Sequence, residues 1–234
     1  EEGPFSVFQD YYVTGTGKNP VVEYQFMTRR RDAIFKNLQN GSEMEGCVFH
    51  KIPMCATIYR RLKDVGGGPN LHNVVALPGI FGVIVQMTQR YYGEAKNLLM
   101  AALSSEYHHP KIAIAVDADV DIFNHSEVLW ALATRVNPQQ DVVVIPGTHN
   151  HGMDASLPEL GATGTALWQR LGSKMLIDAT IPPLADAKAR ANFERIRPHN
   201  PQLRLEDFAA EASLPLVRAL SPLFFGSKLL RGDS

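Results

Sequence analysis

The chain has 234 residues, of which 45% are hydrophobic, and its formal net charge is -1 at pH 7. This size suits one large domain or two small ones, and the charge gives no indication of binding to nucleic acid or an anionic membrane. No apolar run approaches the roughly 18 residues of a membrane span, and no signal peptide is visible. Cys47 and Cys55 match neither a zinc spacing nor a redox motif, which favours a reducing cytoplasm.

The first 103 residues predict an alternation of strands and helices. In chain order the patterns indicate a strand at 21–27, helices at 29–38 and 55–65, strands at 71–77 and 83–88, and a helix at 92–103. The run from Gly66 to Pro69 should end the second helix, because glycine and proline interrupt helical structure.

The stretch 111–145 has the pattern of a buried strand, a helix and a second buried strand. Residues 112–116 are almost continuously apolar, as in a strand covered on both faces. A helix is expected over 126–136, with Ser126 as its N-cap, and a strand over 142–145. This order predicts a right-handed βαβ unit.

The rest of the chain predicts a long loop over 147–172 and a short strand over 174–177. A boundary is expected at Pro182 and Pro183. Two further helices are expected, over 185–196 and 205–220. The whole pattern is typical of an α/β fold, with a mixed sheet and flanking helices.

Three aspartates alternate in the sequence DADVD after the first of these buried strands: Asp117, Asp119 and Asp121. A calcium loop would need glycine and glutamate where the chain has Ile122 and Val128. We therefore expect the carboxylates to accept hydrogen bonds from nearby backbone amides at the strand end. A supporting role at a ligand site stays open, because such sites gather at the carboxyl ends of strands.

His149 and His151 are separated by one residue, as in some zinc sites, but no carboxylate or cysteine lies at a helpful local spacing. A polar loop at the rim of a pocket is the favoured interpretation. Trp130 is expected either at an interface or in the core.

Several strings, in this order, resemble the carboxyl-terminal half of the UbiD-type decarboxylases. They are EGPF at 2–5, RRDAI at 30–34, GEAKNLLMAAL at 93–103, the block from VDADVDI to WALATR at 116–135, and GSKMLIDAT at 172–180. The resemblance covers residues 1–181. It implies a non-oxidative, reversible decarboxylation of an aromatic or α,β-unsaturated carboxylic acid with prenylated FMN.

The resemblance also implies roles for individual residues. Glu2 falls on the family's catalytic acid/base and would protonate the carbon that loses carbon dioxide. A second acidic residue usually follows five positions later, where this chain has Val7, so the proton path is in doubt. Phe5 and Val7 would shape an apolar substrate pocket, and Lys174 could face a phosphate or a carboxylate of the cofactor site. The segment after the strand at 142–145 would approach the substrate, through Thr148, His149 and His151.

The implied organisation has four parts: residues 1–28 end a flavin-binding domain, 29–50 form a linker helix, 51–181 form the carboxyl-terminal α/β oligomerisation domain, and 182–234 form a helical tail. A divalent metal (Mn or Mg) and K⁺ would clamp the cofactor through an N-terminal part that this sequence lacks, so no metal ligand is assigned here. Expected partners are the carboxylic acid substrate, that N-terminal half and further copies in a dimer or hexamer. The alternative is a non-catalytic assembly half, with the flavin held by another segment or chain.

Overall fold

A five-stranded mixed sheet forms the centre of the chain in the computed structural model, which describes residues 1–7, 9–12, 15–38, 43–157 and 171–196. The strands are β1 (Leu71–Ala76), β2 (Gly82–Met87), β3 (Ile112–Val116), β4 (Val142–His149) and β5 (Leu171–Ala179). They lie in the order β1-β2-β3-β5-β4. β2, β3 and β5 are parallel, while β1 and β4 pair antiparallel at the two edges. The predicted α/β class with a mixed sheet is therefore confirmed.

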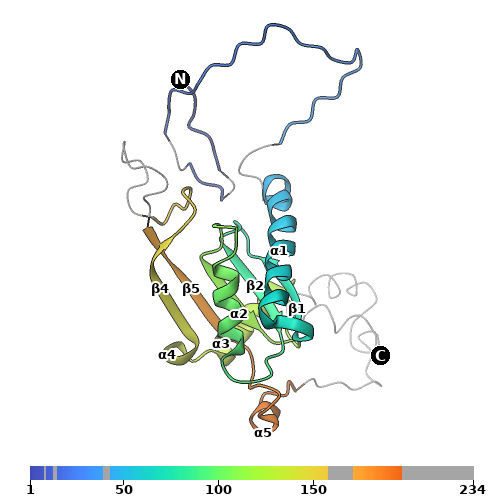
Figure 1. Cartoon of the computed structure of the whole chain (residues 1–234), viewed down its shortest axis with the longest axis vertical. Helices are drawn as coiled ribbons and strands as arrows, with labels where there is room; N and C mark the ends of the chain where they lie inside the picture. The colour runs from blue at the N-terminus through green and yellow to red at the C-terminus, as the bar shows by residue number, and fades with distance from the viewer. Residues whose placement is uncertain (8, 13–14, 39–42, 158–170, 197–234) are drawn as a thin grey trace, which may run out of the picture.

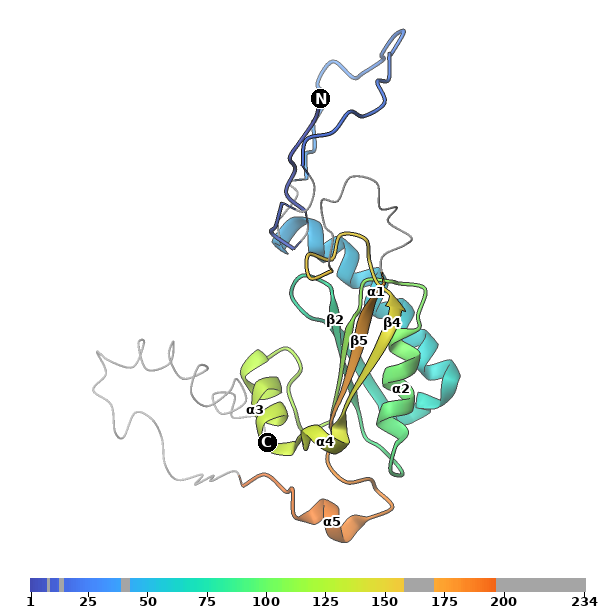
Figure 2. The ribbon, with the colours of Figure 1, turned by 90° about the vertical axis from the view of Figure 1, so that its left-hand side faces the viewer.

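Helices cover both faces of this sheet (Figure 1). The covering helices are α1 (Val48–Leu62), α2 (Glu94–Leu103) and α3 (His125–Arg135). The short helices α4 (Pro138–Asp141) and α5 (Ala187–Ala191) lie at the lower end of the sheet in Figure 1. α1 and α2 pack side by side on one face, and α3 lies on the other (Figure 2). Single turns of π- and 3-10 helix flank α1, at Glu43–Cys47, Lys63–Gly67 and Gly68–Asn70.

The core has two layers, one on each face of the sheet. Ala113 and Ala115 of β3 face the layer under α1 and α2, whereas Ile114 and Val116 face the layer under α3. The small alanines let α2 approach the sheet closely. β3 is therefore buried on both faces, as its continuous apolar sequence predicts.

The βαβ unit lies elsewhere than the sequence predicts. β5 lies between β3 and β4, and β4 runs antiparallel to β5 at the edge of the sheet. The stretch 111–145 is therefore not a βαβ unit. The parallel pair joined by a helix is β2–α2–β3. The four consecutive β-branched residues at 142–145 indicate a strand, but they do not indicate which strand pairs with it. Val143 and Val144 of β4 are exposed.

Several element boundaries also differ from the prediction. α1 begins seven residues before Cys55 and contains Pro53, which cannot donate a backbone hydrogen bond. Asn124, not Ser126, caps α3, because its side chain accepts a hydrogen bond from the Ser126 backbone N–H. The helix expected over 185–196 shortens to α5, and the one over 205–220 lies outside the described residues.

Residues 21–27 and 29–38 form neither the expected strand nor the expected helix. They run as an extended, exposed segment whose apolar side chains include Phe26, Ile34 and Phe35. A strand pattern forms a strand only beside a partner strand, and the described residues provide none for this segment. Separately, no helix in the described ranges is long and apolar enough to cross a membrane.

Candidate active site

The first residues form an irregular hairpin that projects from the sheet (Figure 1). Glu2 and Gly17 exchange two backbone hydrogen bonds of 2.8 Å, and the Val7 N–H donates to the Tyr11 carbonyl at 3.0 Å. Oε2 of Glu2 accepts a hydrogen bond from Nδ2 of Asn19 at 2.6 Å. Glu2 is exposed.

The turn of this hairpin contacts the end of the sheet at which the parallel strands begin. Nε2 of Gln9 donates to the carbonyl of Met153, in the loop after β4. Gln9 also lies beside Gly79, in the tight turn between β1 and β2. Burial raises the pKa of the Cys47 thiol, just before α1, and the negative charge of Asp10, next to Gln9, raises it further. Two separate loops thus lie against the hairpin turn, and the charge of Asp10 acts on the residue before α1.

Five of the eight histidines of the chain gather at the same end of the sheet. The rings of His109 and His151 stack with centroids 4.2 Å apart and planes 21° from parallel. His108 and His149 meet edge to face at 5.1 Å. His50 of α1 lies 6.1 Å from His109. These side chains, which we call the histidine cluster, come from α1, the segment before β3, and the end of β4.

Two members of the histidine cluster, His109 and His151, have a lowered pKa. The pKa of His109 is lowered to about 4, mainly by burial and to a smaller extent by the nearby rings of His151, His50 and His108. Burial likewise lowers the pKa of His151, with a smaller contribution from His108 and an opposing one from Asp154. Nδ1 of His151 accepts the Met153 backbone N–H at 3.2 Å, which assigns the ring proton to Nε2.

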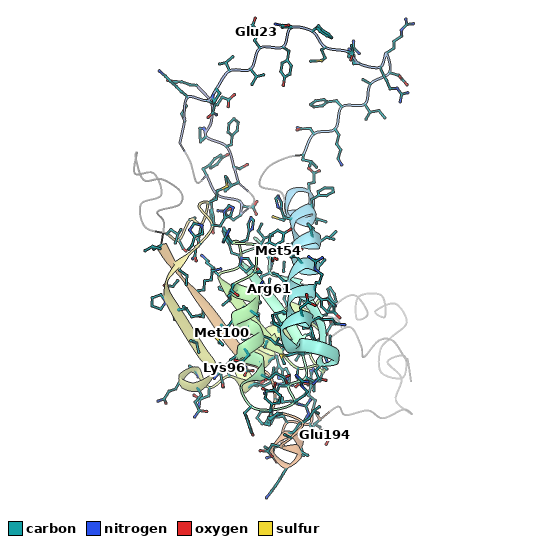
Figure 3. All side chains as sticks on the ribbon, in the orientation of Figure 1. Glu23, Met54, Arg61, Lys96, Met100 and Glu194 are labelled. Atoms are coloured by element: carbon teal, nitrogen blue, oxygen red, sulfur yellow. The ribbon has the colours of Figure 1, made fainter. Side chains whose placement is uncertain are left out.

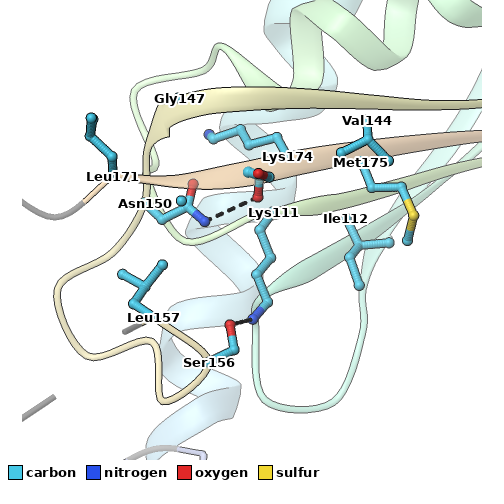
Figure 4. A pocket seen from close by; sticks show the side chains of 12 residues that line it. Lys111, Ile112, Val144, Gly147, Asn150, Ser156, Leu157, Leu171, Lys174 and Met175 are labelled. Carbon is cyan, nitrogen blue, oxygen red and sulfur yellow. Dashed lines mark hydrogen bonds between the residues drawn. The ribbon is translucent and has the colours of Figure 1, made fainter. Parts of the chain in front are cut away.

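Two buried polar side chains, Asn150 and Asp154, hold the loop that carries His151, and Figure 4 shows the first of them. Asn150 donates from Nδ2 to the Ser173 carbonyl at 3.1 Å. Asp154 receives Nζ of Lys111 at 2.7 and 2.9 Å and the hydroxyl of Ser156 at 2.8 Å. Burial acts to raise the pKa of Asp154, but these hydrogen bonds and the Lys111 charge outweigh it, so its pKa is lowered. The loop is therefore anchored to the sheet by a charged pair.

A cavity of about 570 Å³ lies between this loop and β4 and β5 (Figure 4). Lys174 lines it, but the residue is only 7% exposed, and its ammonium group donates to the Leu103 carbonyl at the end of α2, at 2.6 Å. Burial lowers the pKa of this ammonium group. The surroundings of Lys174 thus support a structural contact with α2.

The structure brings some of the predicted site residues together and separates others. His149 and His151 lie in the histidine cluster, and Thr148 donates to the Asn150 side-chain oxygen at 3.3 Å. Val7 lies half-buried in the hairpin turn, while Phe5 is 56% exposed on the leg that leads to Glu2.

Sequence reasoning missed four residues at this end of the sheet: Gln9, His50, His108 and His109. The adjacent pair His108 and His109, directly before a buried strand, was an available signal. Nothing local in the sequence indicates that Gln9 reaches Met153, because the two residues are 144 positions apart.

The aspartates of DADVD lie at the opposite end of the sheet, where the parallel strands finish. The prediction of backbone hydrogen bonding is confirmed for Asp117, which accepts from the Ala118 N–H, and for Asp121, which accepts from the Phe123 N–H. The sequence did not predict that Asp117 also pairs with Arg190, and Asp119 with Arg135.

Trp130 lies against two guanidinium groups at this end of the sheet. Those of Arg135 and Arg195 lie 4.8 and 4.2 Å from its ring centre, and the residue is 36% exposed, so Trp130 is not a plain core residue. In the described part of the chain, no group of three or more histidine, cysteine, aspartate or glutamate side chains is arranged to hold a metal ion.

Comparison with known proteins matches residues 47–179 to the 3-octaprenyl-4-hydroxybenzoate carboxy-lyase C-terminal domain. The phenolic acid decarboxylase of Streptomyces sp. (strain D7) is 33% identical over 195 residues, which make up 82% of this chain and 38% of that protein. The anhydromevalonate phosphate decarboxylase of Methanothermobacter thermautotrophicus is 31% identical over 83% of this chain and 43% of that protein. The chain thus spans about two fifths of the length of these curated relatives.

Solved structures give the same result. The UbiD-class enzyme HmfF of Pelotomaculum thermopropionicum, in complex with FMN, superposes with a TM-score of 0.71 at 29% identity, over 89% of this chain and 44% of that one. An evolved dimeric form of HmfF with prFMN gives a TM-score of 0.65 at 28% identity, over 89% of this chain and 41% of that one. The mixed sheet, its order of elements and the match over more than half of the sequence agree: the chain belongs to the UbiD family, through that family's C-terminal domain.

Proposed function

We propose that this chain is the carboxyl-terminal part of an enzyme that reversibly decarboxylates an aromatic or α,β-unsaturated carboxylic acid with prenylated FMN. The observation that carries the proposal is the position of Glu2. It lies on a hairpin whose turn is fixed against the C-terminal domain by Gln9, and its carboxylate accepts a hydrogen bond from Asn19. Relatives of the domain are decarboxylases, and HmfF structures contain FMN or prFMN.

In this proposal Glu2 delivers the proton to the carbon that has lost carbon dioxide. A carboxylic acid can do this near neutral pH when an apolar surrounding raises its pKa. Phe5 is exposed on the same leg of the hairpin and would form part of such an apolar wall. The flavin, when bound, supplies the electron sink that makes loss of carbon dioxide feasible.

The described residues fit one wall of a flavin site. They contribute a carboxylate and apolar side chains, but no cluster in the described ranges could hold a metal ion. The resemblance to the family implies that the divalent metal, the K⁺ and the cofactor phosphate are held by a part of the enzyme outside this chain. The long exposed apolar side chains of residues 21–35 support contact with such a part, since a solvated segment rarely presents so many together.

The substrate-facing part of this domain would be the hairpin turn and the loop after β4. Val7 lies in that turn, and His149 and His151 lie in the histidine cluster beside it. Imidazole nitrogens can donate or accept hydrogen bonds. The pocket would therefore accept a polar ring substituent, in agreement with the phenolic acids on which two of the similar enzymes are named.

The alternative is that the chain is an assembly half that only completes another segment's site. The Glu2→Gln variant of the intact enzyme separates the two proposals. We expect turnover and substrate proton exchange to fall by about 10²- to 10⁴-fold, with flavin content unchanged. Glu23→Gln is the matched control, because Glu23 lies on the extended segment (Figure 3). Unchanged turnover in Glu2→Gln would contradict the catalytic role of Glu2.

A further inference from the structure

The hairpin that carries Glu2 meets the domain through a short chain of hydrogen bonds. We propose that Gln9, Met153 and His151 form a clasp that holds this hairpin in place, and that protonation of His151 opens the clasp. The inference rests on the proposed function only in giving the hairpin a catalytic purpose.

The first link is the Gln9 side chain. A carbonyl oxygen can only accept, so the contact with the Met153 carbonyl requires the Nε2 end of the amide to face it. Oε1 is then buried and has no hydrogen-bond partner among the described residues. Burial of an unsatisfied oxygen costs free energy, so the bond to Met153 and the packing beside Gly79 must hold Gln9 in place.

The second link is the backbone of Met153, which His151 holds. Nδ1 of His151 accepts the Met153 N–H at 3.2 Å, and the His151 carbonyl accepts the next N–H, that of Asp154, at 2.9 Å. Two contacts from one residue thus fix the conformation of the loop at Met153. The Met153 carbonyl, which binds Gln9, points where this conformation directs it.

Protonation acts on the second link. Because Nε2 of His151 already carries the ring proton, an added proton can go only to Nδ1. The ring would then present a donor to the Met153 N–H, which is also a donor, and the contact would be lost. Displacement of Met153 removes the acceptor of Gln9.

The surroundings of His151 set the pH at which this happens. His109 stacks on the ring, and His108, His149 and His50 lie near enough to disfavour a further positive charge. Asp154 favours the charge, but it is engaged by Lys111. Asp10 is the acidic residue of the hairpin turn beside Gln9. Since the pKa of His151 is lowered by burial, the clasp is closed at neutral pH and opens in acid.

The test is hydrogen–deuterium exchange of residues 1–12 in the intact enzyme at pH 7.5 and pH 5, corrected for the intrinsic effect of pH. In the wild type we expect the protection of this peptide to fall at least about threefold at pH 5, while residues 112–116 of β3 stay protected. His151→Asn keeps an acceptor oxygen near the position of Nδ1 but does not titrate, so its hairpin should be protected at both pH values. Gln9→Ala should exchange fast at both.

His125→Asn is the matched control, because His125 is an exposed histidine at the start of α3, on the other side of the domain. It should behave as the wild type does. Equal protection of Gln9→Ala and wild type would overturn the clasp, and an unchanged pH response in His151→Asn would overturn the role of His151. This readout does not require turnover, so failure of the Glu2 assignment and failure of the clasp remain distinguishable.

Discussion

Arg190 and Asp117 form a two-pronged ion pair, with Nη2 to Oδ1 at 2.8 Å and Nη1 to Oδ2 at 3.1 Å. The Asp117 side chain is 2% exposed at the carboxyl end of β3, and Arg190 belongs to α5, beyond the proline boundary. The same guanidinium group donates to the Pro182 carbonyl at 2.8 Å. The segment after β5 is therefore fastened to the end of a central strand by one arginine.

Replacement of this arginine should destabilise the fold. Arg190→Gln leaves the buried carboxylate of Asp117 without its charged partner, and we expect the free energy of unfolding to fall by about 2–4 kcal/mol, measured by urea denaturation. Arg30→Gln is the control, because Arg30 and Asp32 pair in solvent with side chains 81% and 75% exposed. It should change stability by no more than about 0.5 kcal/mol. A loss in Arg190→Gln as small as in the control would show that water replaces the arginine.

The sequence predicts features whose cause is local. The continuous apolar run of β3 needs no other segment to be recognised as a buried strand, and the spacing of 92–103 is sufficient for α2. The strand pattern of 21–27 fails for the complementary reason, because no described strand lies beside it. The edge position of β4 was missed because pairing with β5 depends on residues about 30 positions away.

The candidate site was predictable only in part, for the same reason. His149 and His151 were recognised as a pair because they are close in the sequence. Their partners His50 and His109 come from α1 and the segment before β3, and only the fold brings them together. Lys174 belongs to the string GSKMLIDAT that resembles the family, yet its ammonium group reaches the end of α2, which its own strand does not reveal.

Gly172 allows the loop after β4 to pack on β5. A Cβ atom at this position would lie 2.5 Å from Nδ2 of Asn150 and 2.7 Å from a methyl carbon of Leu157. We expect Gly172→Ala to lower the free energy of unfolding by about 1–3 kcal/mol, because both neighbours are buried and must shift. Gly15→Ala, where a Cβ meets nothing within 4 Å, is the control and should be nearly neutral. Equal stability of the two variants would mean that the loop moves aside freely.

Stability should depend on pH through His109. Its pKa falls from the ordinary 6.5 to about 4 in the folded chain, chiefly through burial. Between these values the unfolded chain binds a proton that the folded chain does not, so the free energy of unfolding decreases as pH falls from 6.5 and levels off below about 4. The loss attributable to His109 should approach about 2–3 kcal/mol.

Urea denaturation at several pH values between 7 and 4 measures this dependence. The His109→Gln variant should have a shallower slope, because glutamine does not titrate. His125→Asn removes an exposed histidine and should keep the slope of the wild type. A slope that is the same in all three proteins would assign the pH dependence to other groups.

Lys174→Met tests whether this lysine serves the cofactor or the fold. Loss of the donor to the Leu103 carbonyl should cost about 1 kcal/mol of stability, offset in part because the buried ammonium group is itself costly. Flavin content of the intact enzyme should not change, since the ammonium group is directed to α2. Lys96→Met is the control, because Lys96 also donates to a backbone carbonyl, that of Gln140, but from an exposed position (Figure 3). A tenfold loss of flavin affinity in Lys174→Met at unchanged stability would instead support the cofactor role that the sequence suggests.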